Sequence, residues 1–183
     1  MLGYSSVAHA GYIMVGLSAV SAGGLAAAAF YSLAYVLMNL TCFWVVCRLS
    51  TDGRNLKMDD LNGLYHRAPG LAFILAVAAF SLVGLPPTSG FMGKLFLLTA
   101  AWNRGNNWLI IVAAVNTAIS IYYYLNLVRH AYTSEAEGDL PSPRPGSAFW
   151  GGVLAAILLL LGVFPGPVFR YAEMAGELLI SNF

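Results

Sequence analysis

One lysine and a pair of prolines lie close together inside a long apolar segment of this sequence. Pro86 and Pro87 precede Lys94 by a few residues, and mostly apolar residues flank all three. Proline removes a backbone N–H and clashes with the preceding turn, so no helix runs undisturbed through the pair. A lone ammonium in hydrocarbon costs about 3 kcal/mol or more. A lysine shielded from water can accept and release a proton near neutral pH, which predicts a role in proton relay.

A structural alternative exists for Lys94, since a lysine near a helix end can extend along apolar surface and place its ammonium at the interface. Lys94 lies well inside its segment, between Pro69 and Trp108, and not near either end. The position therefore favours a functional lysine over an interfacial one.

Polar side chains recur at helical spacing in three other apolar segments. The three stripes are Ser5-His9-Tyr12, Tyr31-Tyr35-Asn39 and Asn116-Ser120-Tyr124. One such stripe is typical of hydrogen bonding between membrane helices. Three of them beside a buried lysine predict a hydrated path, with His9, Tyr35, Ser120 and Tyr124 as candidate members of a proton wire. His9 is the strongest of these because imidazole titrates near physiological pH.

These side chains need helices to position them, and the composition indicates membrane helices. The chain has 183 residues, of which 59% are hydrophobic and 9% are charged. A soluble domain has roughly 25% charged residues, so this chain lacks a soluble surface. The sequence predicts an all-α polytopic membrane protein, and its net charge of +1 gives no reason to expect nucleic acid. Cys42 and Cys47 do not have a metal-ligand or redox spacing.

The apolar pattern predicts five membrane spans. They cover about residues 2–20, 25–47, 69–101, 108–129 and 148–164. The third is far longer than the roughly 20 residues of a straight span, yet cutting it in two leaves a second piece that is too short. We therefore expect one discontinuous span, broken at Pro86 and Pro87, with Gly90 and Gly93 as part of the break. Residues 166–183 are expected to form an amphipathic surface tail.

Basic residues are unequally distributed between the connections. Loops 49–68 and 131–147 lie on one side in this topology. Together with the flanking Arg48 and Arg129 they carry six of the nine lysines and arginines, which predicts that they are cytoplasmic. No Gly-rich phosphate loop, cysteine cluster or haem-type histidine pair occurs. The sequence thus predicts a chain that moves charge and holds no cofactor.

Three stretches resemble the antiporter-like membrane subunits of respiratory complex I. Residues 2–12, LGYSSVAHAGY, are similar to the family signature LAYSSIAHAGY. Residues 84–94, GLPPTSGFMGK, are similar to the element GIPPTAGFIGK of subunit N, the counterpart of mitochondrial subunit 2. Residues 121–125, IYYYL, match a run of the same subunit. The resemblance covers nearly the whole chain, in the family's order, and these motifs are specific.

The resemblance implies a translocase subunit of NADH:quinone oxidoreductase in a bacterial inner membrane or an organellar membrane. The family fold has fourteen spans, and the five here correspond to the tenth to fourteenth. Lys94 then matches the lysine of the second half-channel. The resemblance also implies other complex I membrane subunits, lipid and protons as partners, with NAD, FMN, iron–sulfur clusters and quinone in partner subunits.

The chain begins inside its first apolar run, so we expect it to be the C-terminal portion of a longer subunit. One alternative is a truncated structural fragment that carries no protons. Another is a subunit of an Mrp-type cation/proton antiporter or of a membrane-bound hydrogenase.

Overall fold

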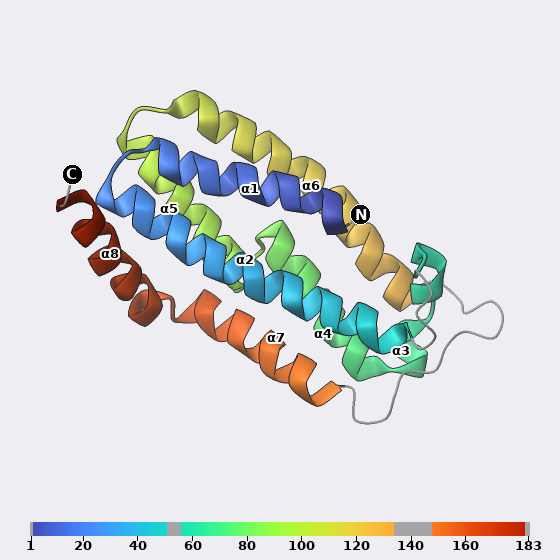
Figure 1. The fold of residues 1–183 in the computed structure, drawn as a ribbon. Coiled ribbons are helices and arrows are strands. Elements are labelled where there is room, and N and C mark those ends of the chain that lie inside the picture. Colours follow the sequence, from blue (N-terminus) through green and yellow to red (C-terminus); the bar gives the residue numbers. More distant parts are fainter. Residues whose placement is uncertain (1, 51–55, 134–147, 182–183) are drawn as a thin grey trace.

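The computed structural model describes residues 2–50, 56–133 and 148–181, and this part of the chain is helical with no strand (Figure 1). In chain order the helices are α1 (Leu2–Ser18), α2 (Ala22–Leu49), the 3-10 helix η1 (Met58–Leu61), α3 (Leu64–Arg67), α4 (Pro69–Val83), α5 (Ser89–Asn103), α6 (Asn107–Thr133), α7 (Ala148–Val163) and α8 (Gly166–Ser181). The all-α fold and the discontinuous third helix are confirmed, because α4 and α5 are separate helices on either side of residues 84–88.

Local signals in the sequence explain several helix ends. Ser21 caps α2 by accepting a hydrogen bond from the Gly24 N–H at 3.0 Å. Pro69 stands in the first turn of α4, where its missing N–H has no intrahelical partner to lose. Gly84 ends α4 at φ +88°, a left-handed conformation that glycine adopts without steric cost.

The long helices run side by side along one axis, and α2 occupies the middle of the bundle (Figure 1). α2 packs against α1, α4, α5, α7 and α8. α4 starts at the α3 end of the bundle and α5 continues toward the opposite end, so the two half-helices together cover its length. This arrangement places the break between them near the middle of the bundle.

Two hydrophobic clusters form the interior. The larger one fills the α3 end with side chains from α2, α3, α4, α6 and α7, including Leu64, Leu71 and Leu75. The smaller one lies among α1, α2, α5 and α6 and includes Tyr12, Tyr31 and Leu97. The polar residues singled out from the sequence lie at or between these two clusters.

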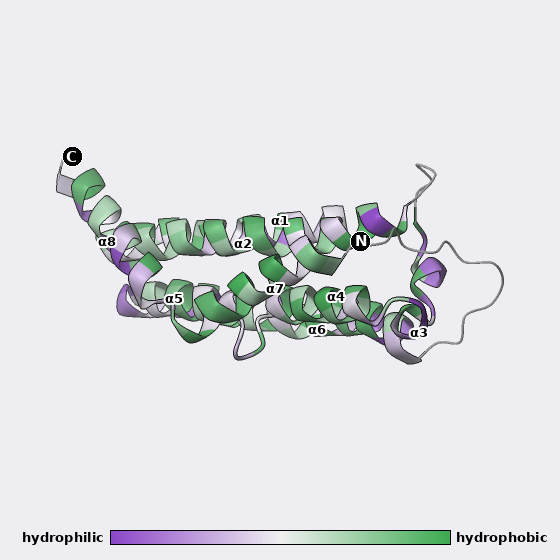
Figure 2. Cartoon of the chain, turned by 90° about the horizontal axis from the view of Figure 1, so that it is seen from below, coloured by the Kyte–Doolittle hydropathy of each residue, from purple (hydrophilic) through white to green (hydrophobic). Residues whose placement is uncertain are grey.

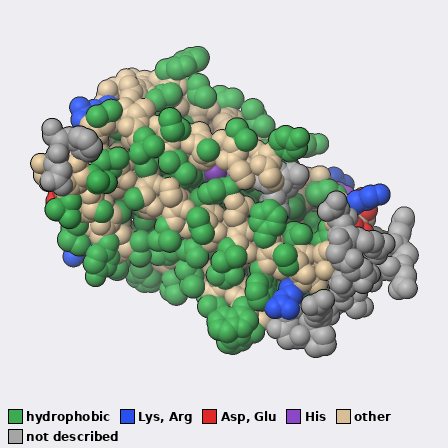
Figure 3. All heavy atoms as spheres, in the orientation of Figure 1, with side chains coloured by type: hydrophobic (Ala, Val, Ile, Leu, Met, Phe, Trp, Pro, Cys, Tyr) green, Lys and Arg blue, Asp and Glu red, His purple; other side chains and the backbone are tan. Residues whose placement is uncertain are grey.

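The outer surface is suited to a membrane. Figure 2 shows hydrophobic residues along the long helices, and on the face in Figure 3 the charged side chains lie at the two ends. Among the described residues α2 and α6 are long and apolar enough to cross a bilayer singly, and α7 with α8 qualifies as a pair bent by 73°. α4 is a shorter apolar helix. The prediction of a membrane protein is confirmed, while the count of five spans stays a prediction.

The residues that the structure describes include only part of the predicted loops and tail. Residues 51–55 of loop 49–68 and residues 134–147 of loop 131–147 lie outside the described residues. The expected tail is the helix α8, whose Phe169 ring stacks on Phe96 of α5 with ring centroids 4.0 Å apart. Arg170, Glu173 and Glu177 are exposed on α8, as the amphipathic pattern requires.

Candidate functional site

Lys94 lies in the second turn of α5 and points back to the end of α4. Its Nζ donates hydrogen bonds to the carbonyl oxygens of Val83 at 2.8 Å and Leu82 at 3.3 Å. These carbonyls belong to the last turn of α4, where no intrahelical N–H follows to bond them. The side chain is only 6% exposed, so the ammonium is held inside the bundle and does not reach the interface.

Gly90 and Gly93 do not lie in the break itself, which corrects the sequence-based assignment. Both are inside α5, which begins at Ser89. A Cβ on Gly90 would collide with the Ser81 carbonyl of α4, and a Cβ on Gly93 would lie 2.6 Å from Cδ2 of Tyr31. Their role is therefore close packing of α5 against α4 and α2, and the irregular backbone is confined to residues 84–88, which include Pro86 and Pro87.

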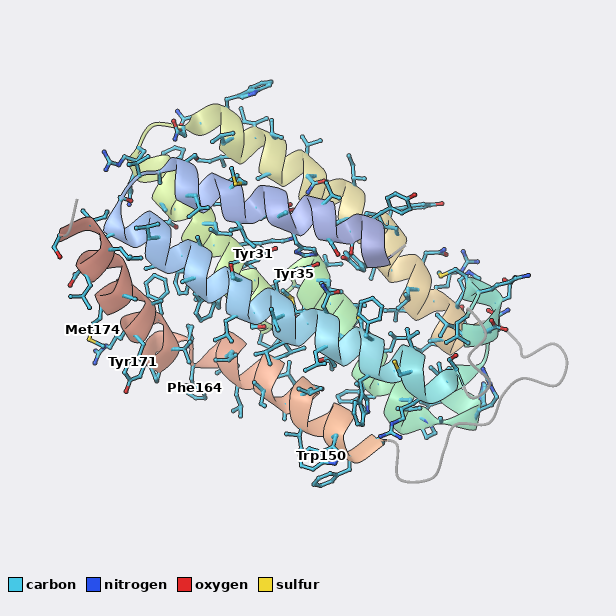
Figure 4. The ribbon with its side chains drawn as sticks, in the orientation of Figure 1. Tyr31, Tyr35, Trp150, Phe164, Tyr171 and Met174 are labelled. Atoms are coloured by element: carbon cyan, nitrogen blue, oxygen red, sulfur yellow. The ribbon has the colours of Figure 1, made fainter. Side chains whose placement is uncertain are left out.

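His9 lies on α1 and joins three helices. Its Nδ1 is 2.7 Å from the Tyr31 hydroxyl of α2, and its Nε2 is 3.2 Å from the Tyr124 hydroxyl of α6. A neutral imidazole has one N–H donor and one acceptor, so either tautomer can bond both tyrosines. The Tyr35 ring stacks on the imidazole with centroids 4.7 Å apart. Figure 4 shows Tyr31 and Tyr35 between α1 and α2.

Tyr12, one turn beyond His9 on α1, connects the lysine to α6. The Lys94 Nζ lies 4.5 Å from the centroid of the Tyr12 ring, a cation–π geometry. The Tyr12 hydroxyl donates to the Ala113 carbonyl at 2.8 Å and also contacts the Thr117 hydroxyl. Because Tyr12 and His9 have ring centroids 6.2 Å apart, the lysine and the histidine belong to one cluster.

The structure brings most of the predicted residues together. Lys94, His9, Tyr35 and Tyr124 are neighbours in this cluster, and Tyr124 is also a hydrogen-bonding neighbour of Ser5. Ser120 is buried, but its hydroxyl donates to the Thr117 carbonyl of its own helix at 2.7 Å. The hydrogen bond of Ser120 therefore stays within α6.

The predicted site omitted Tyr12 and Tyr31, the two tyrosines that link Lys94 and His9 to the other helices. Both belong to stripes visible in the sequence, so spacing could have included them. Tyr12 also lines a groove of about 310 Å³ between α1 and α6, together with Asn116. The groove brings the outer face of the bundle close to the polar cluster.

The arrangement gathers an ammonium, an imidazole and several hydroxyls in one buried cluster. A family described as NADH:quinone oxidoreductase/Mrp antiporter, TM, matches residues 1–120. The chain belongs to this family. The membrane location follows from this membership and from the apolar helices.

Relatives within the family are similar over nearly the whole chain. NADH-quinone oxidoreductase subunit N 2 of Solidesulfovibrio magneticus is 62% identical over 179 residues, which are 97% of this chain and 38% of that protein. Among solved structures, respiratory complex I from Thermus thermophilus with bound Aureothin aligns with a TM-score of 0.81 at 35% identity, over 92% of this chain and 38% of that chain. The resemblance to subunit N is confirmed.

The Mrp complex from Dietzia sp. DQ12-45-1b aligns with a TM-score of 0.87 over 96% of this chain and 41% of that chain. Its sequence identity is 22%, so the similarity concerns the fold alone. The chain spans 38% of the length of its 62% identical relative.

Proposed function

We propose that this chain is the part of a proton-translocating NADH:quinone oxidoreductase membrane subunit that contains a half-channel, with Lys94 as its proton carrier. The observation that carries the proposal is the position of the Lys94 ammonium. It is buried at the break between two half-helices, bonded to the Val83 and Leu82 carbonyls and in contact with Tyr12. Irregular backbone at membrane depth persists only where it lies within protein or lines a watery cavity, and such breaks mark ion sites in transporters.

Opposing influences on the Lys94 ammonium suit a proton carrier. Burial penalises its charge, whereas the carbonyl oxygens at the negative end of α4 stabilise it. A small change in the surrounding charge can therefore transfer the proton. We assign His9, bonded to Tyr31 and Tyr124, as the proton acceptor, and the Tyr12 ring lies near both His9 and Lys94.

The energy for this transfer comes from elsewhere in the assembly. The relatives' name implies redox chemistry between NADH and quinone, and we assign NAD, FMN, iron–sulfur clusters and quinone to partner subunits. Other complex I membrane subunits and lipid are the expected neighbours of this chain. Charge movements in those subunits would act on Lys94 as a coupling free energy between separate sites.

The test is replacement of Lys94 in the assembled complex with the subunit at its natural length. Lys94→Met has a similar length and no titratable group, so NADH-driven proton uptake per electron should fall. Wild-type stoichiometry in Lys94→Met would overturn the role of Lys94.

Lys94→Arg separates titration from helix capping. A guanidinium keeps N–H donors for the Val83 and Leu82 carbonyls but does not release its proton near neutral pH. The arginine variant should assemble normally and still lose uptake. Full uptake in Lys94→Arg would mean that the lysine serves only as a cap, which is the non-pumping structural alternative.

The antiporter alternative predicts a different coupling. An Mrp-type subunit would exchange Na⁺ or K⁺ for protons across vesicles without NADH. Cation-dependent proton movement in the absence of NADH, lost in Lys94→Met, would favour that function over ours.

A further inference from the structure

The first turn of α5 has no cap of its own. The N-cap residue Thr88 makes no side-chain cap, since its hydroxyl donates to the Leu85 carbonyl at 2.7 Å. The N–H groups at a helix start have no intrahelical acceptor and usually need a side-chain oxygen. Here the Gly90 N–H donates to the Ser81 hydroxyl at 3.2 Å. Ser81 belongs to α4, so the start of α5 is capped by the preceding half-helix.

The end of α4 is capped in the opposite direction. The Gly84 and Leu85 N–H groups both bond the Phe80 carbonyl, at 3.0 Å each, and leave the next carbonyls for other donors. Lys94 of α5 supplies those donors to Leu82 and Val83. Each half-helix therefore satisfies terminal backbone groups of the other.

From this reciprocal capping we propose that Ser81 is a positioning residue for Lys94. The bond from Gly90 to Ser81 fixes the start of α5 against the last turn of α4, and this register places the Lys94 Nζ on the Leu82 and Val83 carbonyls. Ser81 itself exchanges no proton. The expected effect of Ser81 on activity rests on the proposed function of Lys94, whereas the capping rests on geometry alone.

Ser89 adds a second connection across the break. Its hydroxyl lies 3.3 Å from the Ser81 hydroxyl, and both serines are fully buried. The Gly90 to Ser81 bond does not depend on this hydroxyl–hydroxyl contact.

Few other titratable groups face Lys94 from the helices packed around it. α1 contributes Tyr12 and His9. α2 contributes Tyr31 beside Gly93 and Tyr35 stacked on His9, and α6 contributes Tyr124 beyond His9 and Tyr123 beside Tyr124. Within the described bundle, α4 and α7 contain no titratable side chain. A shift in the pH dependence of proton uptake can therefore be traced to this small set.

The experiment is Ser81→Ala in the assembled complex, with NADH-driven proton uptake measured against pH. Without the Gly90–Ser81 bond, the Leu82 and Val83 carbonyls should hold the Lys94 ammonium less well. The alkaline limb of the plot of proton uptake against pH should therefore move to lower pH by roughly half a unit, which corresponds to a fall of about threefold in the proton affinity of Lys94. Ser89→Ala keeps the Gly90 bond and should leave the limb in place. The matched control is Thr41→Val, because Thr41 is equally buried but bonds the Leu37 carbonyl of its own helix.

Ser81→Cys serves if the alanine variant does not assemble, since a thiol of similar size is a weak acceptor and should give a smaller shift of the same sign. Hydrogen exchange of the α5 N-terminus reports capping independently of activity and should speed up in Ser81→Ala but not in Thr41→Val. An unchanged pH profile with unchanged exchange would overturn the inference. Faster exchange with wild-type uptake in Lys94→Met would overturn the proposed function and leave the capping intact.

Discussion

The apolar core at the α3 end of the bundle and the polar cluster around Lys94 are both buried, yet they are built from different side chains. At the α3 end Leu64, Leu71 and Leu75 are at most 1% exposed and belong to the larger hydrophobic cluster. At the level of Lys94 the interior holds the ammonium, the His9 imidazole and tyrosine hydroxyls. The same exclusion of water thus surrounds an apolar core in one region and a paired polar cluster in the other.

This difference teaches which interactions stabilise each region. The apolar core is stabilised by volume and contact area, so its response to substitution depends on the cavity created. The polar cluster is stabilised by pairing, because a buried donor or acceptor without a partner costs about 1–3 kcal/mol. Substitutions in the first region should change stability alone, and substitutions in the second should change stability and proton transfer together.

The largest expected effect on stability is Leu75→Ala at the α3 end. Loss of the buried side chain should cost about 3 kcal/mol and lower the thermal melting temperature of the complex. Proton uptake per electron should stay at the wild-type value, because no group of the polar cluster is removed. The exposed Leu95→Ala is the control and should melt near wild type. A changed proton uptake per electron in Leu75→Ala would contradict the distinction between the two regions.

His9→Phe should be the most damaging change in the polar cluster. A phenyl ring fills similar space but leaves the Tyr31 and Tyr124 hydroxyls without their partner, at a cost of about 2 kcal/mol. We expect a lower melting temperature and also a loss of NADH-driven proton uptake. A destabilised His9→Phe variant with full proton uptake would mean that His9, like Leu75, contributes to stability alone.

The double variant His9→Phe/Tyr31→Phe sharpens this comparison. Removing both partners of a buried hydrogen bond is less costly than removing one, so the double variant should regain about 1 kcal/mol relative to His9→Phe. Uptake should stay lost because the imidazole is absent. Additive stability losses, measured by melting of both single variants and the double, would show that the two groups are not paired.

Tyr12→Phe should have the smallest effect. It keeps the ring beside Lys94 and removes the hydroxyl that bonds Ala113 and contacts Thr117, at a cost of about 1 kcal/mol. We expect a modest fall in the rate of proton uptake with assembly retained. A rate equal to wild type would limit the contribution of Tyr12 to its ring.

Periodicity alone was enough to predict much of the cluster. The stripe containing His9 and the stripe containing Tyr124 each present polar groups on one helix face, so their members could be grouped within a helix. Spacing within one helix carries no information about the neighbouring helix. For this reason the meeting of His9 with Tyr31, and of Tyr12 with Lys94, was not predicted.

Ser120, Gly90 and Gly93 show the limits of reasoning from residue type. Ser120 follows the polar stripe, but a serine inside a helix can satisfy itself on its own backbone, and this one does. The sequence analysis places both glycines in the break beside Pro86 and Pro87, whereas in the structure they permit close packing inside α5. A glycine's role depends on what lies beside it, which the sequence does not specify.

The sequence by itself determined the all-helical membrane fold, the break near Pro86-Pro87 and the buried placement of Lys94. Those features follow from local chemistry: hydropathy over a helix length, a missing N–H and the cost of a charge in hydrocarbon. Only the tertiary structure decided that Lys94 bonds the end of α4 and that Ser81 bonds the start of α5. The physical reason is that both contacts join groups on two half-helices whose relative position depends on packing against α1, α2, α6 and α7.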